Sequence, residues 1–441
     1  MRFGIDFGTT RTVIAAVDRG NYPVLPVTDP EGDPQEYIPS VVALDGDRLV
    51  GGWEALALDS STLVRSFKRL LSAGDATAET PVRLGEQERP LGEVLAAFAG
   101  VVVEHLREHV GDGDIEIVLG VPANARSAQR LLTLDAFTRA GATVLGMVNE
   151  PSAAAFEYTH LHSRTLSSRR SNVIVYDLGG GTFDVTLMRI DGPEHNVETS
   201  LGISLLGGDD FDEALADLSL AAAGRAGDVF GRRARRKLLD EARTAKEQLK
   251  PQSRRMVLEL GDDDVIVPVA EFYDEVTPLV EQSLEIMQPL IGASESLADT
   301  EIAGVYLVGG ASALPLVPRM LRERFGRRVH RSPLPTASTA VGLAIAADPD
   351  SHYHLRDRLS RGIGVFRERD AGAAVSFDAL VGPDAEAGSG ESITITRRYR
   401  AAHNVGWFRY VEYSALDAGS DDPGDFTLLA EVLVPFDPAL R

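Results

Sequence analysis

Residues 173–190 read VIVYDLGGGTFDVTLMRI, in which the turn-like DLGGGTFD begins at Asp177 and lies between two apolar runs. Residues 3–17 read FGIDFGTTRTVIAAV and have the same plan around Asp6. Apolar runs on either side of a glycine-rich turn predict a strand, a tight turn and a second strand. The distance between the two copies is far beyond a solenoid period of roughly 20–50 residues, so the repeat predicts a duplicated half-domain. Two such halves that face each other would enclose a cleft.

Both turns carry the groups that hold phosphate. Glycine tolerates backbone angles that other residues resist, so successive N–H groups of such a turn can point into one concavity. Threonine hydroxyls add donors, and the carboxylates of Asp6 and Asp177 suit Mg²⁺ or its water shell. A single turn of this kind is typical of an ordinary hairpin, but the second copy favours a phosphate site. The expected donors are Gly8, Thr9 and Thr10 in the first turn and Gly179, Gly180, Gly181 and Thr182 in the second.

The rest of the first 350 residues alternates strand-like and helix-like apolar spacing, which predicts α/β layers. Helices are expected at 91–109, 127–140, most of 211–250, 272–291 and 338–347, and strands at 115–121, 256–269 and 304–308. We expect residues 1–350 to form one nucleotide-binding domain. Its lobes would cover about 1–168 and 172–337, and the helix at 338–347 would close it.

The composition changes after Asp348. Residues 351–360 are expected to be a linker, and residues 361–441 to form a small β-rich domain. The short β-type runs, separated by glycine and proline clusters, lie at 363–366, 374–381, 393–396, 407–413 and 426–434.

Charge and composition narrow the choice of ligand and partner. The chain has 66 acidic and 44 basic residues and a net charge of −22, a field that repels nucleic acid and anionic lipid. A bound nucleotide would need a divalent cation in such a field, so Mg²⁺ is implied. The absence of cysteine excludes disulfides, thiolate zinc sites and cysteine nucleophiles. With no leader after Met1 and no run of roughly 20 apolar residues, we expect a cytoplasmic protein without membrane contact.

Five motifs, in matching order and spacing, resemble the 70-kDa heat-shock chaperone (DnaK-like) family of the actin-like ATPase superfamily. They lie at residues 4–10, 148–155, 177–184, 206–212 and 307–310. The resemblance implies an α/β fold with a duplicated actin-like (ribonuclease H-like) ATPase domain of two lobes, followed by a small β-rich domain. It further implies ATP or ADP with Mg²⁺ in the cleft and slow hydrolysis that switches a peptide-binding β domain.

The resemblance also assigns roles to single residues. Lys68 resembles the catalytic lysine of the family, Glu150 the carboxylate that helps to position the metal-bound water, and Thr182 the threonine near the γ-phosphate. Asp6 and Asp177 match the aspartates of the metal shell. Gly208, Lys246, Gly309 and Gly310 are expected to complete the nucleotide contacts. From the sequence alone, Lys68 would be an ordinary surface lysine and Glu150 an acid at a helix N-terminus. Phosphoryl transfer needs mainly positioning and charge neutralisation, which this set supplies.

The adenosine side departs from the family pattern. Arg243 stands at a glutamate position, Glu247 at an arginine position and Lys250 at a serine position, and Ala313 replaces a second arginine. An arginine stacked on a ring contributes about 0.5–2 kcal/mol. One hypothesis is therefore a weaker, phosphate-dominated or base-tolerant site. The simpler alternative is that Arg243 and Glu247, four residues apart on a helix, pair with each other.

Three functions remain open. The first is an ATP-hydrolysing, chaperone-like protein that binds unfolded or extended polypeptide, with Pro122 and Arg130 matching family residues that relay the nucleotide state. The second is a scaffold that hydrolyses ATP weakly or not at all and binds one dedicated protein partner. It is favoured because the chain is expected to be too short for a full substrate sandwich and lid, and because its linker is charged. The third, a small-molecule kinase, is disfavoured by the DLGGGTFD motif and by the lack of a recognisable acceptor-binding aspartate.

Overall fold

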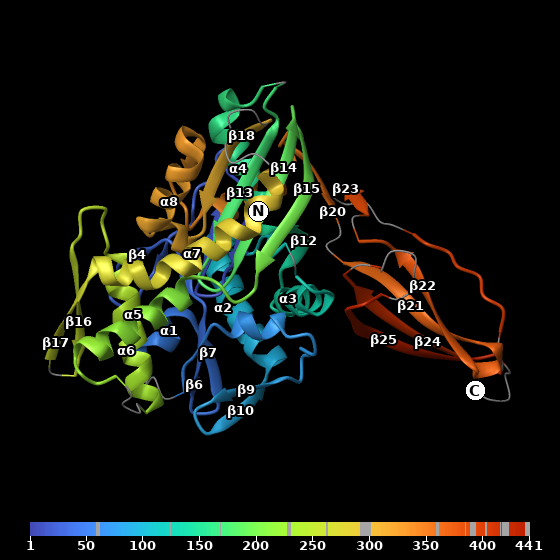
Figure 1. The fold of residues 1–441 in the computed structure, drawn as a ribbon. Helices are drawn as coiled ribbons and strands as arrows, with labels where there is room; N and C mark the ends of the chain where they lie inside the picture. Colours follow the sequence, from blue (N-terminus) through green and yellow to red (C-terminus); the bar gives the residue numbers. More distant parts are fainter. Residues whose placement is uncertain are drawn as a thin grey trace.

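The computed structural model is a mixed α/β protein with several sheets (Figure 1). It describes residues 1–58, 62–123, 125–167, 169–226, 231–261, 263–291, 301–358, 361–383, 385–388, 394–401, 404–414, 416 and 423–436. Ser168, at the end of the first expected lobe, and residues 359–360 of the expected linker lie outside the described residues, as do parts of the expected C-terminal domain.

The first hairpin belongs to a five-stranded sheet with the order β12-β11-β1-β2-β5. The strands are β1 (Arg2–Phe7), β2 (Arg11–Ala16), β5 (Ile38–Pro39), β11 (Glu116–Val121) and β12 (Thr143–Asn149). β1 pairs with β2 in antiparallel and with β11 in parallel orientation. Helices α2 (Leu91–Val110) and α3 (Ser127–Arg139) pack against each other beside this sheet. The core between them is aromatic, with the rings of Phe7 and Phe98 stacked at 5.6 Å.

The second hairpin belongs to a seven-stranded sheet with the order β19-β18-β13-β14-β15-β20-β23. The strands are β13 (Asn172–Leu178), β14 (Phe183–Asp191), β15 (Glu194–Ile203), β18 (Ile302–Val308), β19 (Val329–Arg331), β20 (His354–Arg358) and β23 (Glu386–Gly388). β13 pairs with β14 in antiparallel and with β18 in parallel orientation, as β1 does with β2 and β11. The repeat that the sequence predicts is therefore also present in the strand pairing.

Helices and a hairpin cover the second sheet. They are α5 (Gly208–Ala222), α6 (Arg232–Glu247), α7 (Val269–Ile291), α8 (Leu316–Phe325) and the hairpin β16 (Arg255–Leu260) with β17 (Asp263–Pro268). α7 is helical in spite of Pro278 and Pro289, because its apolar face is buried in the core.

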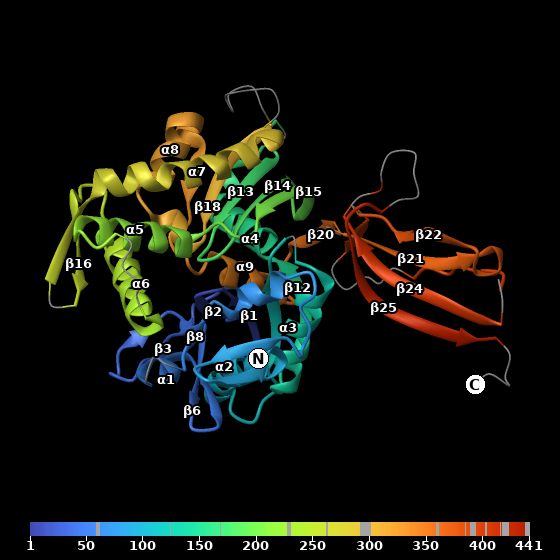
Figure 2. The same cartoon turned by 60° about the horizontal axis from the view of Figure 1, so that its bottom comes forward.

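Helices α4 (Glu150–His162) and α9 (Ser338–Ala347) lie between the two sheets (Figure 2). The sequence predicts α9 with these bounds. The two helices touch through their backbones, because a Cβ atom on Gly342 would lie 1.8 Å from the carbonyl oxygen of Ala153. α9 also lies directly on β1, where a Cβ on Gly4 would lie 2.2 Å from the nitrogen of Ala344. Small residues therefore allow the central helices to bring the two sheets close together.

Smaller elements surround the five-stranded sheet. The strands are β3 (Val27–Thr28), β4 (Pro34–Gln35), β6 (Val41–Asp45), β7 (Arg48–Gly51), β8 (Val64–Arg65), β9 (Pro81–Leu84) and β10 (Gln87–Pro90). The helix α1 (Gly52–Ala57) and the 3₁₀ helix η1 (Phe67–Ser72) complete this part. Further 3₁₀ turns are η2 (Ser163–Thr165), η4 (Gly310–Ala313), η5 (Gly326–Arg328) and η6 (Asp370–Gly372).

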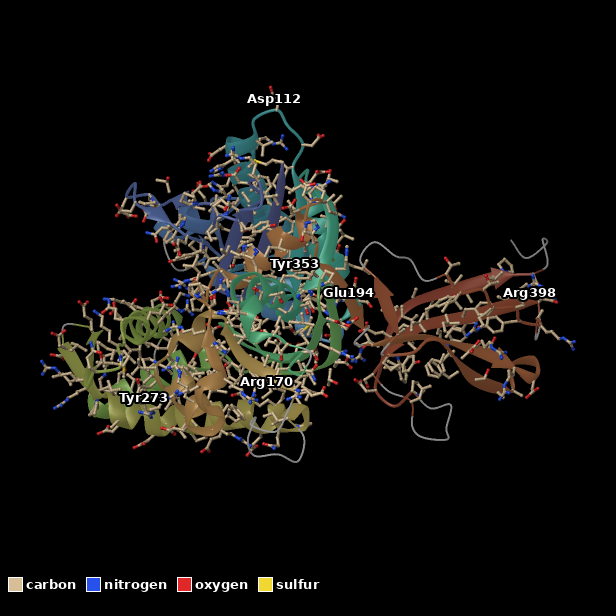
Figure 3. The ribbon with its side chains drawn as sticks, turned by 90° about the horizontal axis from the view of Figure 1, so that it is seen from above. Asp112, Arg170, Glu194, Tyr273, Tyr353 and Arg398 are labelled. Atoms are coloured by element: carbon tan, nitrogen blue, oxygen red, sulfur yellow. The ribbon has the colours of Figure 1, made fainter. Side chains whose placement is uncertain are left out.

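A four-stranded antiparallel sheet follows, in the order β22-β21-β24-β25, and stands to one side of the rest (Figure 3). Its strands are β21 (Gly362–Arg369), β22 (Ala374–Val381), β24 (Val405–Tyr413) and β25 (Phe426–Pro435). Three expectations need correction. The run at 256–269, expected as a strand, forms the hairpin of β16 and β17, and its last residue, Val269, begins α7. Residues 394–396 form no strand, although one was expected at 393–396. His354–Arg358 lies in the expected linker but forms β20, because its backbone pairs with the edge of β15. None of the helices described here is both long and apolar enough to span a membrane.

Candidate functional site

The turns of the two repeated hairpins touch each other. A Cβ atom on Gly180 would lie 2.7 Å from Thr10 Oγ1, and one on Gly181 would lie 2.9 Å from Thr9 Cγ2. Each turn is closed by its own backbone, since the amide of Gly8 donates to the Asp6 carbonyl at 3.0 Å and the amide of Gly179 donates to the Thr182 carbonyl at 3.0 Å. Both strand pairs therefore end at the same place, from opposite sheets. Only residues without a side chain at positions 180 and 181 allow this approach.

The two turns line a cavity of about 320 Å³. This is within the size range of small-molecule sites. Among the expected site residues, all except Gly181 contribute to its wall: Asp6, Gly8, Thr9, Thr10, Lys68, Glu150, Asp177, Gly179, Gly180, Thr182, Gly208, Lys246, Gly309 and Gly310. Gly181 lies beside the wall, against Thr9 and Arg69. The structure thus brings together residues from seven separate parts of the sequence.

Lys68 lies in the floor of the cavity and is only 6% exposed, so the interpretation as a surface lysine is wrong. It comes from η1, and its Nζ donates to Glu150 Oε1 at 2.8 Å and to the backbone carbonyl of Phe7. Glu150 is the first residue of α4 and follows β12 directly. The direct junction of β12 with α4 and the short η1 helix therefore place an anion and a cation together below the two turns.

Three aspartates surround this ion pair: Asp184 is buried, and Asp6 and Asp177 are partly exposed to the cavity. Burial raises the pKa of Asp6 well above its ordinary value, and the charge of Glu150 adds to this effect while that of Lys68 opposes it. Burial, then Glu150 and Asp184, likewise raise the pKa of Asp177. Burial and Glu150 raise the pKa of Asp184 to about 7. The cavity floor therefore holds more carboxylates than cations, and a bound cation would lower the pKa of each of them.

The carboxylates suit a hydrated metal ion. Among the described residues, no three histidine, aspartate or glutamate side chains converge closely enough to enclose a metal ion by themselves. Mg²⁺ usually keeps several waters and takes one or two carboxylates together with phosphate oxygens. Asp6 and Asp177, one from each hairpin, match that donor set.

The start of α5 supports the second turn. The amide of Gly208 donates to the Gly179 carbonyl at 3.0 Å, and the amide of Asp209 donates to the Gly180 carbonyl at 2.8 Å. Lys246 Nζ donates to the carbonyl of Gly208 at 2.7 Å, which fixes the end of α6 against the start of α5. These contacts hold the turn in one conformation.

The loop after β18 lies against the same floor. Gly309 has φ +82°, and a Cβ atom there would lie 2.4 Å from Asp177 Oδ1. Glycine is required for both reasons, the left-handed backbone and the close approach. The loop Gly309–Gly310 therefore forms a wall beside the carboxylate of Asp177.

The ion pairs of Arg243 and Glu247, on the side of the cavity where the family resemblance implies the adenosine site, differ from the expected one. Arg243 pairs with Asp209 at 2.9 Å and with Asp212 at 3.1 Å. Glu247 pairs with Arg11 at 2.5 Å. The expected pairing of Arg243 with Glu247 is thus wrong, because each side chain has a partner from a distant part of the sequence. Ala313 lines the cavity and presents only a methyl group there, while Lys250 is exposed and is not part of the cavity wall.

Sequence reasoning missed several residues of the site, namely Arg69, Asp184, Asp209 and Asp212. Asp184 had a signal, since it ends the same DLGGGTFD motif that Asp177 begins, and the two are paired across the hairpin. Arg69 had none. It donates to the carbonyl of Gly181 at 3.0 Å and pairs with Asp210 at 3.3 Å, contacts that depend on the two sheets meeting.

Comparison with known proteins finds both repeated hairpins within one family match. The family model described as Hsp70 protein matches residues 2–352, which include both hairpins and α9. The chain therefore belongs to the Hsp70 family. The match covers most of the two large sheets and ends just before β20.

Curated relatives are similar over most of this chain. Chaperone protein HscA of Klebsiella pneumoniae (strain 342) is 34% identical over 394 residues, which is 82% of this chain and 61% of that protein. Chaperone protein HscA of Cronobacter sakazakii is 35% identical over 401 residues, with the same coverage of 82% and 61%. The Chaperone protein HscA homolog of Aliivibrio fischeri is 32% identical over 389 residues, again with coverage of 82% and 61%. The chain spans about three fifths of the length of these relatives.

Proposed function

We propose that this protein binds Mg-ATP in the cavity between two lobes and hydrolyses it slowly to switch the binding of a polypeptide. The lobes would be built on the five-stranded and the seven-stranded sheet, with domain limits near 1–350 and 361–441. The observation that carries the proposal is the contact between the two glycine-rich turns above a buried lysine and its carboxylates. This is donor and acid chemistry suited to a triphosphate and a divalent cation.

Each residue of the floor has a proposed role. The backbone amides of both turns and the hydroxyls of Thr9, Thr10 and Thr182 would hold phosphate oxygens. Asp6 and Asp177 would hold Mg²⁺, which neutralises phosphate charge when it is bound.

Lys68 and Glu150 would act on the reacting end of the nucleotide. Lys68, oriented by Glu150 and by the carbonyl of Phe7, would offer its positive charge to the γ-phosphate and the attacking water. Glu150 would orient that water. Positioning and charge stabilisation of this kind are the main contributions a protein makes to phosphoryl transfer. Gly208, Lys246, Gly309 and Gly310 would form the wall beside the nucleotide.

The C-terminal sheet supports the polypeptide part of the proposal. β25 is an edge strand of that sheet, and several of its apolar side chains are exposed, among them Leu428, Leu429, Val432 and Leu433. An exposed apolar edge suits an extended polypeptide, which can add its own backbone hydrogen bonds to the strand. The name that the curated relatives share, chaperone protein, favours the same class of partner.

A second candidate is a scaffold that binds nucleotide, hydrolyses it weakly or not at all, and serves one dedicated protein partner. It is favoured by the base side of the cavity, where Arg243 is engaged by Asp209 and Asp212 and where Ala313 offers no guanidinium. A site without stacked arginines would bind nucleotide mainly through its phosphates.

Phosphate release by the full chain with Mg-ATP tests the proposal. We expect release that is stimulated by an unfolded polypeptide and abolished by a metal chelator. Lys68→Met should lower the rate on the order of 100-fold while nucleotide still binds, since it removes one electrostatic contact to the reacting groups. Asp177→Ala should weaken binding of Mg-nucleotide itself.

The outcomes separate the candidates. Turnover that ignores polypeptide supports the scaffold, and turnover only with a sugar-like acceptor supports a small-molecule kinase. A wild-type chain that binds no Mg-nucleotide contradicts the proposal altogether.

A further inference from the structure

One ion pair joins the two sides of the cavity. Arg11, at the start of β2 in the five-stranded sheet, lies with its guanidinium nitrogen 2.5 Å from Glu247 Oε2. Glu247 is the last residue of α6, which packs on α5 and β16 in the other half of the molecule. Both side chains line the cavity. The pair therefore crosses from one wall to the other.

Arg11 is held in place on its own side. Its guanidinium lies 4.4 Å from the centre of the Tyr37 ring, and Tyr37 in turn packs on Trp53 at 5.3 Å. A stacked guanidinium loses less conformational freedom when it forms an ion pair than a free one does. Arg11 is thus already oriented toward the opposite wall.

Glu247 reaches across because the cation one helical turn before it on α6 is engaged elsewhere. Arg243, one helical turn before Glu247, is bound by Asp209 and Asp212. Lys246 is held by Asp212 at 2.5 Å and by the carbonyl of Gly208. The carboxylate of Glu247 is therefore left to pair with Arg11, at a position where the family resemblance implies an arginine instead.

We infer that the Arg11–Glu247 pair is a latch that must open before a nucleotide leaves the cavity. The inference rests on the proposed function, because it names a control on the same site. Other contacts join the same two sides, among them Arg65 with Asp240 at 3.0 Å and Ser66 Oγ with Asp209 at 2.9 Å. The latch therefore sets part of the release rate and not all of it.

The size of the effect follows from exposure. The side chains of Arg11 and Glu247 are 29% and 43% exposed. Water and salt screen such a pair, so its loss should speed release about two- to fivefold. Added salt should speed release from the wild-type chain in the same way, and should have less effect once either partner is removed.

The test measures release of a fluorescent nucleotide, N-methylanthraniloyl-ADP, from the full chain by stopped flow. We expect Arg11→Ala and Glu247→Ala each to release it about two- to fivefold faster than wild type, and the double variant R11A/E247A to release it no faster than either single variant, because each single change already removes the pair. Glu54→Ala is the matched control, since Arg48 and Glu54 also pair at 2.5 Å but lie outside the cavity wall. Its release rate should equal that of wild type.

Two results overturn the latch. The first is that both single variants bind the nucleotide and release it at the wild-type rate. The second is that the double variant releases it as fast as the combined effects of the two single variants predict. A wild-type chain that does not bind the fluorescent nucleotide overturns the proposed function together with the latch. The two failures are thus distinguishable, and a thermal unfolding curve for each variant shows that it is folded.

Discussion

The carboxylate of Glu412 accepts a hydrogen bond from the backbone amide of Ser127 at 2.9 Å. This contact joins the C-terminal sheet to the first turn of α3, which has no capping side chain of its own. Glu412 is 2% exposed, and Arg361 lies 3.5 Å from its other oxygen. A second bond, from Arg126 to Thr427 Oγ1 at 2.7 Å, lies beside it. A carboxylate at a helix N-terminus is favoured by both the free amides and the helix dipole.

Removal of this carboxylate should loosen the sheet from α3. In Glu412→Ala the partly buried Ser127 amide loses its acceptor, at a cost of about 1–3 kcal/mol, while Arg361 keeps its second acidic partner, Asp425, at 3.5 Å. We expect the Ser127 amide to exchange with deuterium at least about fivefold faster. Glu412→Gln keeps an acceptor without the charge, so its Ser127 amide should exchange at a rate between those of the wild type and Glu412→Ala. Equal exchange in all three chains would mean that the contact does not hold the parts together.

The contact between the hairpin turns predicts a steric effect of one methyl group. In Gly180→Ala the new Cβ would meet Thr10 Oγ1 at 2.7 Å, so one turn must shift and the phosphate donors must separate. We expect nucleotide affinity, measured by calorimetry, to fall at least tenfold, about 1.4 kcal/mol. Gly100→Ala is the control, because a Cβ there, inside α2, meets nothing within 4 Å and should stabilise the helix. Unchanged affinity in Gly180→Ala would show that the turns do not act as a pair.

A buried glutamate outside the cavity predicts a pH dependence of stability. Glu157 is 3% exposed and accepts hydrogen bonds from the hydroxyls of Tyr306 at 2.7 Å and Ser332 at 3.1 Å. Burial raises the pKa of Glu157 from 4.5 to about 7. Between these values the folded state keeps the proton and the unfolded state does not. Rising pH therefore favours unfolding in that window, and above it the effect no longer grows.

Glu157→Gln should remove this dependence, while its amide oxygen still accepts from one hydroxyl and its amide nitrogen donates to the other. We expect the free energy of unfolding of the wild type, relative to that of Glu157→Gln, to fall with pH by up to about 1.4 kcal/mol per unit across that window. Urea unfolding of both chains at several pH values measures this difference. A difference that is flat with pH, or that rises, contradicts the assignment.

The cavity wall at Ala313 predicts that one substitution will strengthen nucleotide binding. Ala313 lines the cavity where the family resemblance implies an arginine, so Ala313→Arg should add a stacking contact worth about 0.5–2 kcal/mol. We expect ATP and ADP to bind about two- to thirtyfold more tightly to this variant. Inorganic tripolyphosphate with Mg²⁺ is the control, because it has no base to stack. An equal gain for tripolyphosphate would show that the arginine acts through charge alone.

Local patterns were sufficient to predict the hairpins and most helices. Apolar runs beside Asp6 and Asp177 became β1, β2, β13 and β14, since each strand is buried and bounded by a tight turn. The charged segment His354–Arg358 became β20 although its sequence has no strand pattern. Its pairing with β15 is a backbone contact, which side-chain periodicity does not report.

The candidate site also has one part that local sequence predicts and one part that it does not. The residues of the two turns come from short motifs, and the structure brings them together around Lys68. The ion pairs on the base side depended on distant partners instead. Spacing along α6 favoured a pair between Arg243 and Glu247, but Asp209 and Arg11 are nearer in space. An ion pair at this helical spacing contributes only about 0.2–0.5 kcal/mol, so tertiary neighbours decide the outcome.

The backbone contact between Gly342 of α9 and Ala153 of α4 makes the pair of helices a fulcrum. Helices that already touch through their backbones cannot come closer there, so a rotation of one sheet relative to the other about this contact would keep them packed. The displacement that such a rotation produces grows with distance from this contact. Glu150 and Thr339, on these helices, line the cavity near it, whereas Glu247 lies at the end of α6. Such a rotation would therefore separate the cavity walls at Glu247 first and those near Glu150 and Thr339 last.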